Sequence, residues 1–398
     1  MARVDFWRTE RSSNKSCQIA VPSALAIACG LSLAGCGWWG GQPASEVSPG
    51  EQAVEGGLGL KDITLKQSDQ RGQLLWQLKA KAATYGESRK QVSVNGLEGT
   101  LSQQGKPAYK VKAAQAEVRQ QGEDLFLKGK VIITDLRSQG VFTAKEFEWR
   151  PQKSLLLARK DLNIKHPQVE ITAKEMQASS QTNQVTAKGQ VVAVSQRNRL
   201  RLLTEQLVWQ PQQQQVFAGG LPGQPPTGVQ MFRFGQKGDP RTDRAQGGSL
   251  QADLKTQTVT LASNAKLLLA DPPLEVDSQQ LVWQVKAKTL TSDRPVRVYS
   301  PSQKVTLTAN QGFVNQTLQQ VNMIGNVKAL GQRNAAFLST DQLTWMIPSQ
   351  QIEALGRVFY QQQQPRFTVR GGRAVGLIKE QKVVVTGGDV VTEIFTKN

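Results

Sequence analysis

The sequence predicts an all-β protein, and three observations lead to this fold class. Apolar and polar residues alternate strictly in stretches such as QLLWQLKAKA at 73–82 and QVEITAKEM at 168–176. Gly, Asn, Asp and Pro separate such stretches at intervals of roughly 8 to 12 residues, which is typical of chains made only of strands. Beyond the N-terminal segment, long stretches with the 3.6-residue period of a helix are scarce. We therefore expect roughly 25 to 30 short strands connected as a meander.

Residues 1–35 have the outline of a bacterial lipoprotein signal peptide. Residues 1–17 carry four basic side chains, and an apolar run follows at 19–35. The run ends in LAGC at 33–36, which matches the lipobox at which signal peptidase cuts before a diacylglyceryl-modified cysteine. We therefore expect Cys36 to be lipidated and to hold the protein on a membrane.

The alternative for this segment is an uncleaved transmembrane helix. Such a helix needs about 20 apolar residues, whereas this run is shorter and contains Pro22 and Ser23. Cleavage would remove Cys17 and Cys29 with the peptide, so the mature body would have neither a disulfide framework nor thiol chemistry.

Composition divides the mature chain into a tether and two units. Residues 36–57 are rich in Gly, Pro, Ser and Glu and read as a flexible tether. Residues 58–200 form the first predicted unit, and residues 201–398 form a second, diverged unit. The Pro- and Gly-rich segment at 221–248 lacks clear alternation and is expected to be an insertion near the boundary between the units. A short helix at 112–120 is an alternative to a strand of small residues there.

A phrase built around tryptophan recurs along the chain. It reads KEFEWRPQKSLLLA at 145–158, TEQLVWQPQQQQVFA at 204–218, QQLVWQVKAKTLTS at 279–292 and DQLTWMIPSQQIEA at 341–354. Each copy predicts a strand, a polar turn and a returning strand. With Trp76 included, the tryptophans follow one another at intervals of 73, 60, 74 and 62 residues, which suggests one unit present twice. Independent core tryptophans with a coincidental spacing are the alternative.

A glycine phrase recurs beside the first one. It reads LKGKVIITD at 127–135, AKGQVVAVS at 187–195 and MIGNVKALG at 323–331. A glycine at such a place in a strand often marks a bulge or a tight bend. We expect each of these glycines to interrupt the regular strand pairing.

The sequence gives no sign of an enzyme. The single histidine, His166, precedes Pro167, and no nucleophile or carboxylate stands in a recognisable arrangement with it. No metal cluster or glycine-rich phosphate loop is present, so we expect no catalytic residue, no metal site and no cofactor. A pair of glycosidase carboxylates far apart in the sequence stays open as an alternative.

The chain is strongly basic, with 49 Lys and Arg against 31 Asp and Glu and a formal charge of +18. Basic runs such as SQRNRLRLL at 195–203 would suit nucleic acid. Export from the cytoplasm argues against a nucleic-acid partner, and a solvated strand face accounts for the same run.

The order of the phrases resembles the LptC family, which comprises periplasmic components of lipopolysaccharide export. The resemblance rests on GLGLKDITLKQSDQRGQLLWQLKAKAATYGESRKQVSVNGLEGTL from residue 57, KPAYKVKAAQAEVRQQGEDLFLKGKVII at 106–133 and FTAKEFEWRP at 142–151. It covers roughly residues 58–195, and the later glycine and tryptophan phrases resemble the OstA-like repeat of related proteins. Members of the family are usually shorter and carry one transmembrane helix, from which this chain departs.

The resemblance implies an elongated, open twisted β-jellyroll, here with two consecutive units. An apolar groove between its layers would take the lipid A acyl chains of lipopolysaccharide from an inner-membrane ABC transporter and its permeases. It would pass them to an LptA-like bridge protein that docks by strand pairing, at the edges near 60–66 and 386–394. The resemblance favours the periplasm and a lipid anchor in the inner membrane.

The alternation of side chains along each strand (strand parity) predicts which residues would line this groove. For each of them, ordinary core packing is the alternative. They are Trp76, Leu78, Val92, Val94, Leu125, Leu127, Val131, Ile133, Phe147, Trp149, Ile164, Val169 and Ile171. A non-catalytic periplasmic scaffold that binds peptidoglycan or an acidic polysaccharide is the competing function. It would need a charged surface patch rather than an apolar groove.

Overall fold

The computed structural model describes residues 51–54, 57–85, 91–103, 105–119, 124–136, 139–167, 169–179, 181–182, 184–196, 199–210, 212–235, 242–284, 286–332, 335–363, 366–380 and 382–394. The predicted signal peptide and Cys36 lie outside these residues. Within the predicted tether, Glu51–Val54 forms a strand. In this part of the chain no helix is long and apolar enough to cross a membrane. All described strands belong to one compact unit, Gly50–Asn398.

The described residues form strands joined by turns and loops, which confirms the predicted all-β class. A single turn of 3-10 helix, Pro151–Lys153, is the exception among them. The strands of the first half are β1 (Glu51–Val54), β2 (Gly57–Ser68), β3 (Leu74–Tyr85), β4 (Val92–Gln103), β5 (Lys106–Arg119), β6 (Asp124–Asp135), β7 (Val141–Arg150), β8 (Leu155–His166), β9 (Val169–Ser179), β10 (Gln184–Ser195) and β11 (Leu200–Gln210).

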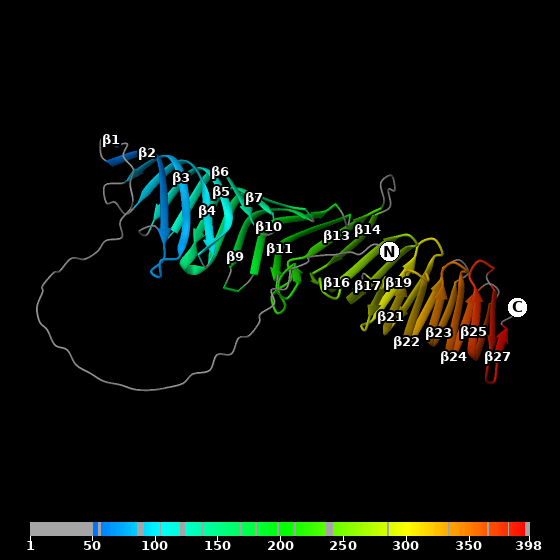
Figure 1. Ribbon diagram of the computed structural model, residues 1–398. Helices are drawn as coiled ribbons and strands as arrows, with labels where there is room; N and C mark the ends of the chain where they lie inside the picture. Colours follow the sequence, from blue (N-terminus) through cyan, green and yellow to red (C-terminus); the bar gives the residue numbers. More distant parts are fainter. Residues whose placement is uncertain are drawn as a thin grey trace, which may run out of the picture. The chain divides into compact units, whose positions relative to one another are not determined.

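The second half continues the same series. Its strands are β12 (Gln215–Ala218), β13 (Val229–Phe234), β14 (Thr242–Gly247), β15 (Ser249–Asp253), β16 (Thr258–Ala270), β17 (Pro273–Gln284), β18 (Thr289–Ser292), β19 (Val296–Ser300), β20 (Val305–Ala309), β21 (Gln311–Asn315), β22 (Gln320–Gly331), β23 (Ala336–Met346), β24 (Gln351–Gln363), β25 (Arg366–Leu377), β26 (Lys382–Thr386) and β27 (Val391–Ile394). Two of these, β13 and β14, lie within the Pro- and Gly-rich segment 221–248. The strands follow one another in chain order, as Figure 1 shows by the change of colour from blue to red.

Pairing is antiparallel and local throughout. From β2 to β11, each strand pairs with the strand before it and the strand after it. Further along, some long strands are divided into two halves. The C-terminal half of β11 pairs with β12 and its N-terminal half with β13, so β12 and β13 together replace one long strand. The pairs β14 with β15, β18 with β19, β20 with β21 and β26 with β27 are divided in the same way.

Each long strand bends near its middle, and the bends fold the sheet into two layers. Tyr109 in β5 and Trp149 in β7 are in edge-to-face contact, with ring centroids 6.1 Å apart. In the pairing, however, Trp149 lies beside Leu125, which lies beside Val118, nine residues beyond Tyr109 along β5. A straight strand of that length would separate the rings by roughly 30 Å. The two halves of each bent strand therefore lie in opposite layers that face one another.

Glycine permits several of these bends. Gly129, Gly189 and Gly325 have φ of +88°, +78° and +77°, and each lies at a shift in the strand register. L-residues other than glycine rarely adopt this conformation. The prediction that the recurring glycine phrase marks a bulge is therefore confirmed.

The alternative of a short helix at 112–120 is wrong for its described part, residues 112–119, which belong to β5. Ala113, Ala116 and Val118 of this stretch are buried in the first core. Their small side chains fit beside β4, where Ala116 lies opposite Val94. Tertiary packing therefore overrides the helix propensity of the alanines.

The tryptophan phrases form hairpins, as predicted. Trp149, Trp209, Trp283 and Trp345 lie opposite Leu156, Val216, Leu290 and Ile352 on the returning strands. When each divided strand is taken as one, these tryptophans lie on every fourth strand, namely β7, β11, β17 and β23. The interval of 74 residues from Trp209 to Trp283 includes the loop at 219–228, which explains its greater length. Because this spacing is the same along the whole series, it does not locate a boundary. The division into two units at 200/201 stays a prediction.

The space between the layers holds two apolar cores. The first core extends from Trp76 to Leu207, and the second from Ala218 to Ala374. Leu202 in β11 packs against both of them. The inner faces of the two layers are therefore apolar on both sides of β11.

Candidate lipid-binding interior

The predicted groove residues come together on the inner faces of the two layers. Ten of them belong to the first core: Trp76, Leu78, Val94, Leu125, Leu127, Val131, Ile133, Phe147, Trp149 and Ile164. Val92 and Ile171 are half-buried and pack against this core. Val169, next to the hairpin between β8 and β9, is half-buried and lies outside the set of residues that form the core.

Side chains fill the space between the layers in this structure. Leu78, Leu125, Val131 and Ile133 each have 0% of their surface exposed. The furrow expected from the resemblance is therefore not open between these residues, because the side chains of the two layers pack against each other. The jellyroll is nevertheless open in its hydrogen bonding. In the described residues, no strand pairing closes the mouth between the two layers, and none connects β2 to β27. An acyl chain would have to part the layers to lie between them.

The side opposite the bends is the mouth of the jellyroll, where hairpins from both layers end. We call the hairpin between β4 and β5 and its equivalents the first rim, and the hairpin between β7 and β8 and its equivalents the second rim. Trp149 and Trp283 both belong to the second rim. Each contacts a residue of the first rim, because Tyr109 packs against Trp149 and the Arg233 guanidinium lies 5.2 Å from the centre of the Trp283 ring. The layers thus touch across the mouth in both cores.

Several inner residues were missed by reading the sequence. Arg233 and Asp243 lie on the inner side of β13 and β14, and alternation along VQMFRF at 229–234 is the signal that could have placed Arg233 there. The indole N–H groups of Trp149, Trp283 and Trp345 are buried without an acceptor among the described residues.

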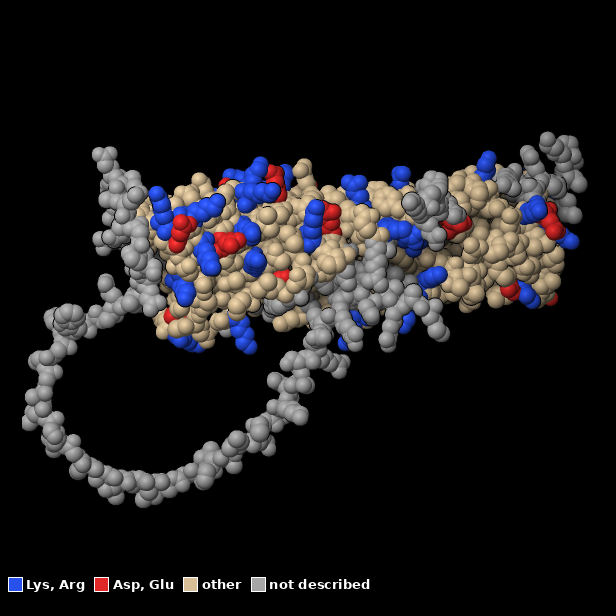
Figure 2. All heavy atoms as spheres, turned by 45° about the horizontal axis from the view of Figure 1, so that its top comes forward, with Lys and Arg blue, Asp and Glu red and all other residues tan. Residues whose placement is uncertain are grey.

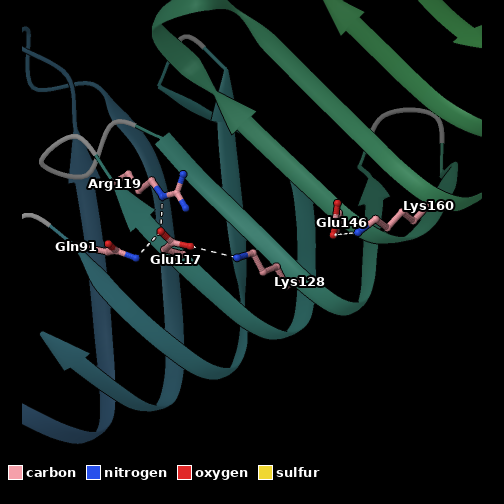
Figure 3. A network of polar contacts seen from close by, with 6 residues as sticks. All are labelled: Gln91, Glu117, Arg119, Lys128, Glu146 and Lys160. Atoms are coloured by element: carbon pink, nitrogen blue, oxygen red, sulfur yellow. Dashed lines mark hydrogen bonds and ion pairs between the residues drawn. The ribbon is translucent and has the colours of Figure 1, made fainter. Parts of the chain in front are cut away.

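The outer face carries paired charges around Glu117, which lies beside Phe126 of the next strand. Glu117 is 8% exposed and accepts hydrogen bonds from Arg119, Gln91 and Lys128, the last at 3.2 Å (Figure 3). The bond from Arg119 lowers the pKa of the Glu117 carboxyl, and burial opposes this effect only in part. In the same region, Lys160 bonds Glu146 at 2.6 Å. Of these two carboxylates, Glu117 is the more buried and is held by more partners.

No metal-binding arrangement emerges in the described part of the chain. It contains no group of three His, Cys, Asp or Glu residues that could hold a metal ion. Burial lowers the pKa of His166, and the Asp135 charge opposes this effect. Basic side chains are spread over the face shown in Figure 2, with the acidic ones lying among them.

A cleft of about 610 Å³ lies on the outer side where the two cores meet. Gln190, Leu203, Glu205, Gln230 and Asn264 contribute to its lining, which mixes polar and apolar side chains. It does not coincide with the predicted groove residues, which lie on the inner faces. The candidate site is therefore the interior and its mouth rather than this cleft.

Two family models match parts of the chain. Residues 25–217 match the family model LptC, described as lipopolysaccharide-assembly, LptC-related. Residues 170–296 match the model of LptA/(LptD N-terminal domain) LPS transport proteins. No curated protein matches the chain.

Among solved structures, one similar chain is LptH from Pseudomonas aeruginosa, described as the LptA homologous periplasmic component of the conserved lipopolysaccharide transport device. It is 12% identical, the match covers 38% of this chain and 79% of that chain, and the TM-score is 0.18. The two family models together span residues 25–296. Over these residues the chain is similar to the LptC-related and the LptA/(LptD N-terminal domain) proteins of lipopolysaccharide transport.

Proposed function

We propose that this protein is a membrane-anchored periplasmic component of lipopolysaccharide export. It would receive the glycolipid from an inner-membrane ABC transporter and pass the acyl chains along its inner faces to the next bridge protein. The observation that carries the proposal is the apolar inner face that continues from the first core to the second through Leu202. The basic character of the chain suits the phosphates and acidic sugars of the cargo.

The energetic reason for such an interior is the cost of acyl chains in water. Each exposed CH₂ group costs about 0.8 kcal/mol, so a chain of twelve carbons costs on the order of 10 kcal/mol. Contacts with the inner faces would remove most of this cost. Since the layers are packed together in this structure, the cargo would replace contacts between the layers with its own. The chain would then act by binding and release, without a catalytic step.

The ends of the sheet are the proposed docking edges. β1 pairs with β2 only as far as Leu60, so the remainder of β2 has a free edge among the described residues. At the other end, β26 and β27 pair, among the described residues, with β25 alone. Val384, Val390 and Val391 are about half exposed there, at 50%, 45% and 49%. Such edges can accept a strand from an LptA-like partner.

The anchor belongs to the same proposal. Cys36 would be acylated and would hold the protein at the inner membrane, with residues up to the first strand as the connection. Mass spectrometry of the intact protein purified from membranes tests this part. A mass without acyl groups, or a chain that still begins at Met1, would exclude the lipoprotein.

The scaffold function remains the second candidate because of the basic outer surface. Lys and Arg are distributed over the face in Figure 2, where an acidic polysaccharide or peptidoglycan would find them accessible. This reading places the ligand on the outer face, whereas export places it on the inner faces. The two functions therefore predict contacts on opposite sides of the same strands.

Neighbouring isoleucines of β6 give the decisive experiment. Ile133 faces the first core with 0% exposure, whereas Ile132 is half-buried on the opposite side of the same strand. A photo-crosslinking amino acid at position 133 should form lipopolysaccharide adducts in cells, and the same residue at position 132 should form few. The pair Leu78 and Lys79 in β3 repeats the comparison. Equal labelling at inner and outer positions would refute transport through the interior and favour the scaffold.

A further inference from the structure

The strand register places one charged pair on the inner side of the second half. In β13, Val229 is buried in the second core and Met231 packs against it, so Arg233 is the next residue on the inner side. Leu200 in β11 and Asp243 in β14 lie beside Arg233 in the two neighbouring strands. Ala245, two residues after Asp243, also belongs to the second core. Both charged side chains thus lie on the face that the apolar residues occupy.

Arg233 is held in a fixed position. Its Nε atom donates to Asp243 Oδ2 at 2.7 Å, and Nη2 approaches the same oxygen at 2.5 Å. The backbone N–H of Ala270 donates to Asp243 Oδ1 at 2.8 Å and so fixes the carboxylate. The guanidinium also lies over the Trp283 ring, at 5.2 Å from its centre. Restraint of this kind lowers the conformational entropy that would be lost when a ligand binds.

The pair leaves donors unused. Arg has five N–H donors, and the contacts with Asp243 involve Nε and Nη2 only. Nη1 takes no part in these contacts, and the buried Nε1 of Trp283 has no acceptor among the described residues. The Arg233 side chain is 37% exposed, whereas that of Asp243 is 17% exposed. The cation can therefore be reached from solvent at the mouth.

Arg233 lies where the two cores meet. Met231, on the same strand, lies opposite Leu202, the residue that packs against both cores. An amphiphile with its acyl chain between the layers must place its headgroup at the mouth, where water remains. A guanidinium is always charged and binds phosphate or carboxylate through two hydrogen bonds. The position and the chemistry of Arg233 therefore suit the headgroup of an anionic amphiphile.

We infer that Arg233, positioned by Asp243 and Trp283, binds the phosphate group of an anionic amphiphile at the mouth between the two cores. The inference rests on the proposed function and deepens it, because it names the group of the glycolipid that the protein recognises at this point. Asp243 acts as a positioning residue, and Trp283 supplies the ring on which the guanidinium lies.

The chain offers a matched control on its outer face. Arg297 in β19 donates from Nη1 to Asp277 Oδ2 at 2.8 Å and lies 5.5 Å from the centre of the Tyr299 ring. Its neighbours Val296 and Val298 are buried in the second core, so Arg297 faces outward. Arg297→Gln removes the same kind of ion pair and ring contact without changing the mouth.

The experiment measures binding of dodecyl phosphate and of uncharged dodecyl maltoside, both below their micelle concentrations, by calorimetry on the full chain. Arg233→Gln should weaken binding of dodecyl phosphate about tenfold or more, the loss expected for a charge-assisted hydrogen bond, and leave dodecyl maltoside unchanged. Arg233→Lys should lose less, and Asp243→Asn should retain the preference for phosphate. Arg297→Gln should bind both compounds like the unmodified protein.

Two outcomes separate this inference from the proposed function. If the unmodified protein and Arg233→Gln bind dodecyl phosphate equally, with unchanged circular dichroism, the inference is overturned even if lipopolysaccharide binds. If the unmodified protein binds no lipopolysaccharide, the proposed function fails whatever the effect on dodecyl phosphate. If Arg233→Gln does not fold, the double variant Arg233→Gln/Asp243→Asn removes the unpaired carboxylate, and an unchanged affinity for dodecyl phosphate in that variant also overturns the inference.

Discussion

At the scale of single residues, Glu117 shows how the outer face stabilises the sheet. It is nearly buried and receives hydrogen bonds from Arg119 and Lys128. Removing one partner from such a group leaves the remaining charges uncompensated. The Glu117 carboxylate therefore contributes to stability only while it is ionised.

Glu117→Gln should lower the free energy of unfolding at pH 7. Because the folded-state pKa of Glu117 lies below its ordinary value of 4.5, the stabilisation is complete above that value and is lost as pH falls through the lowered pKa. The difference between the variant and the unmodified protein should therefore shrink as the pH falls below about 4.5. Urea unfolding at a series of pH values measures it. A difference that stays constant down to pH 3 would contradict the role of the ionised group.

The pair of Glu98 and Lys112 is the control for this measurement. Both side chains are more than half exposed, at 56% and 59%, although they lie 3.1 Å apart. Exposed pairs contribute little because water and salt screen them. Glu98→Gln should therefore leave the unfolding midpoint nearly unchanged at each pH.

The inward-facing residues were predicted correctly from the sequence where apolar and polar residues alternate regularly. Trp76, Leu78, Leu125 and Leu127 lie on inner faces as their parity predicts. Arg233 was missed because an arginine in an inward position breaks the apolar pattern that identifies strand faces. The alternation from Val229 through Met231 indicates the inner side, and the pairing with Leu200 and Asp243 shows which residues lie beside Arg233 there.

At the scale of strands, the bends decide which residues face inward. In β7, Ala144 and then Phe147 and Trp149 are buried in the first core, so the inward parity changes at the bend. In β6, Leu127 and Val131 both face inward, and the parity is kept. In some strands, therefore, counting alternate residues across the bend predicts the wrong face. This is why the prediction left out Met176 in β9, which lies on the inner face.

Glycine at a bend should be harder to replace than glycine in an open turn. Gly356 has φ +80°, and an added Cβ would lie 2.6 Å from Asp341 Oδ2. Asp341 is also the carboxylate that pairs with Arg357. Gly356→Ala should therefore combine a left-handed backbone cost of about 1–2 kcal/mol with the displacement of that pair.

Gly72→Ala isolates the backbone contribution. Gly72 has φ +76° and has no atom within 4 Å of the added Cβ, so only the conformational cost applies. Urea unfolding should give a larger loss for Gly356→Ala than for Gly72→Ala. Equal losses would show that the contact with Asp341 does not matter.

At the scale of the whole folded unit, the two layers are packed together, so a lipid could enter only if they part. Tyr109 and Trp149 join the rims in the first core, and Arg233 and Trp283 join them in the second. The resemblance in the sequence predicts a passage for lipid, and strand parity predicts its apolar lining. The closed packing could not be predicted, because the same apolar side chains can line a groove or fill a core.

A chemical bridge across the mouth tests whether the layers must part. Tyr109→Cys/Trp149→Cys, joined by a short reducible cross-linker, should lose lipopolysaccharide binding when cross-linked and regain it after reduction. The cross-linked and the reduced protein both lack Trp149, so a difference between them is not caused by the loss of this side chain from the core. Binding that persists in the cross-linked state would show that cargo does not enter between these rims.

Phe337 and Phe359 provide the control bridge. Their rings are 6.2 Å apart on adjacent strands, β23 and β24, of one layer. A cross-link between cysteines at these positions joins strands that are already paired and leaves the mouth free. It should not change lipopolysaccharide binding.

The local pairing of the strands also bears on how such a protein can vary in size. When each divided strand is taken as one, each strand pairs only with the strands before and after it, so stability is built up step by step, as in repeat proteins. Gain or loss of a hairpin at either end would change how far the molecule extends without rebuilding the remainder. Proteins that must cover different distances could thus arise from one scheme by a change in the number of hairpins.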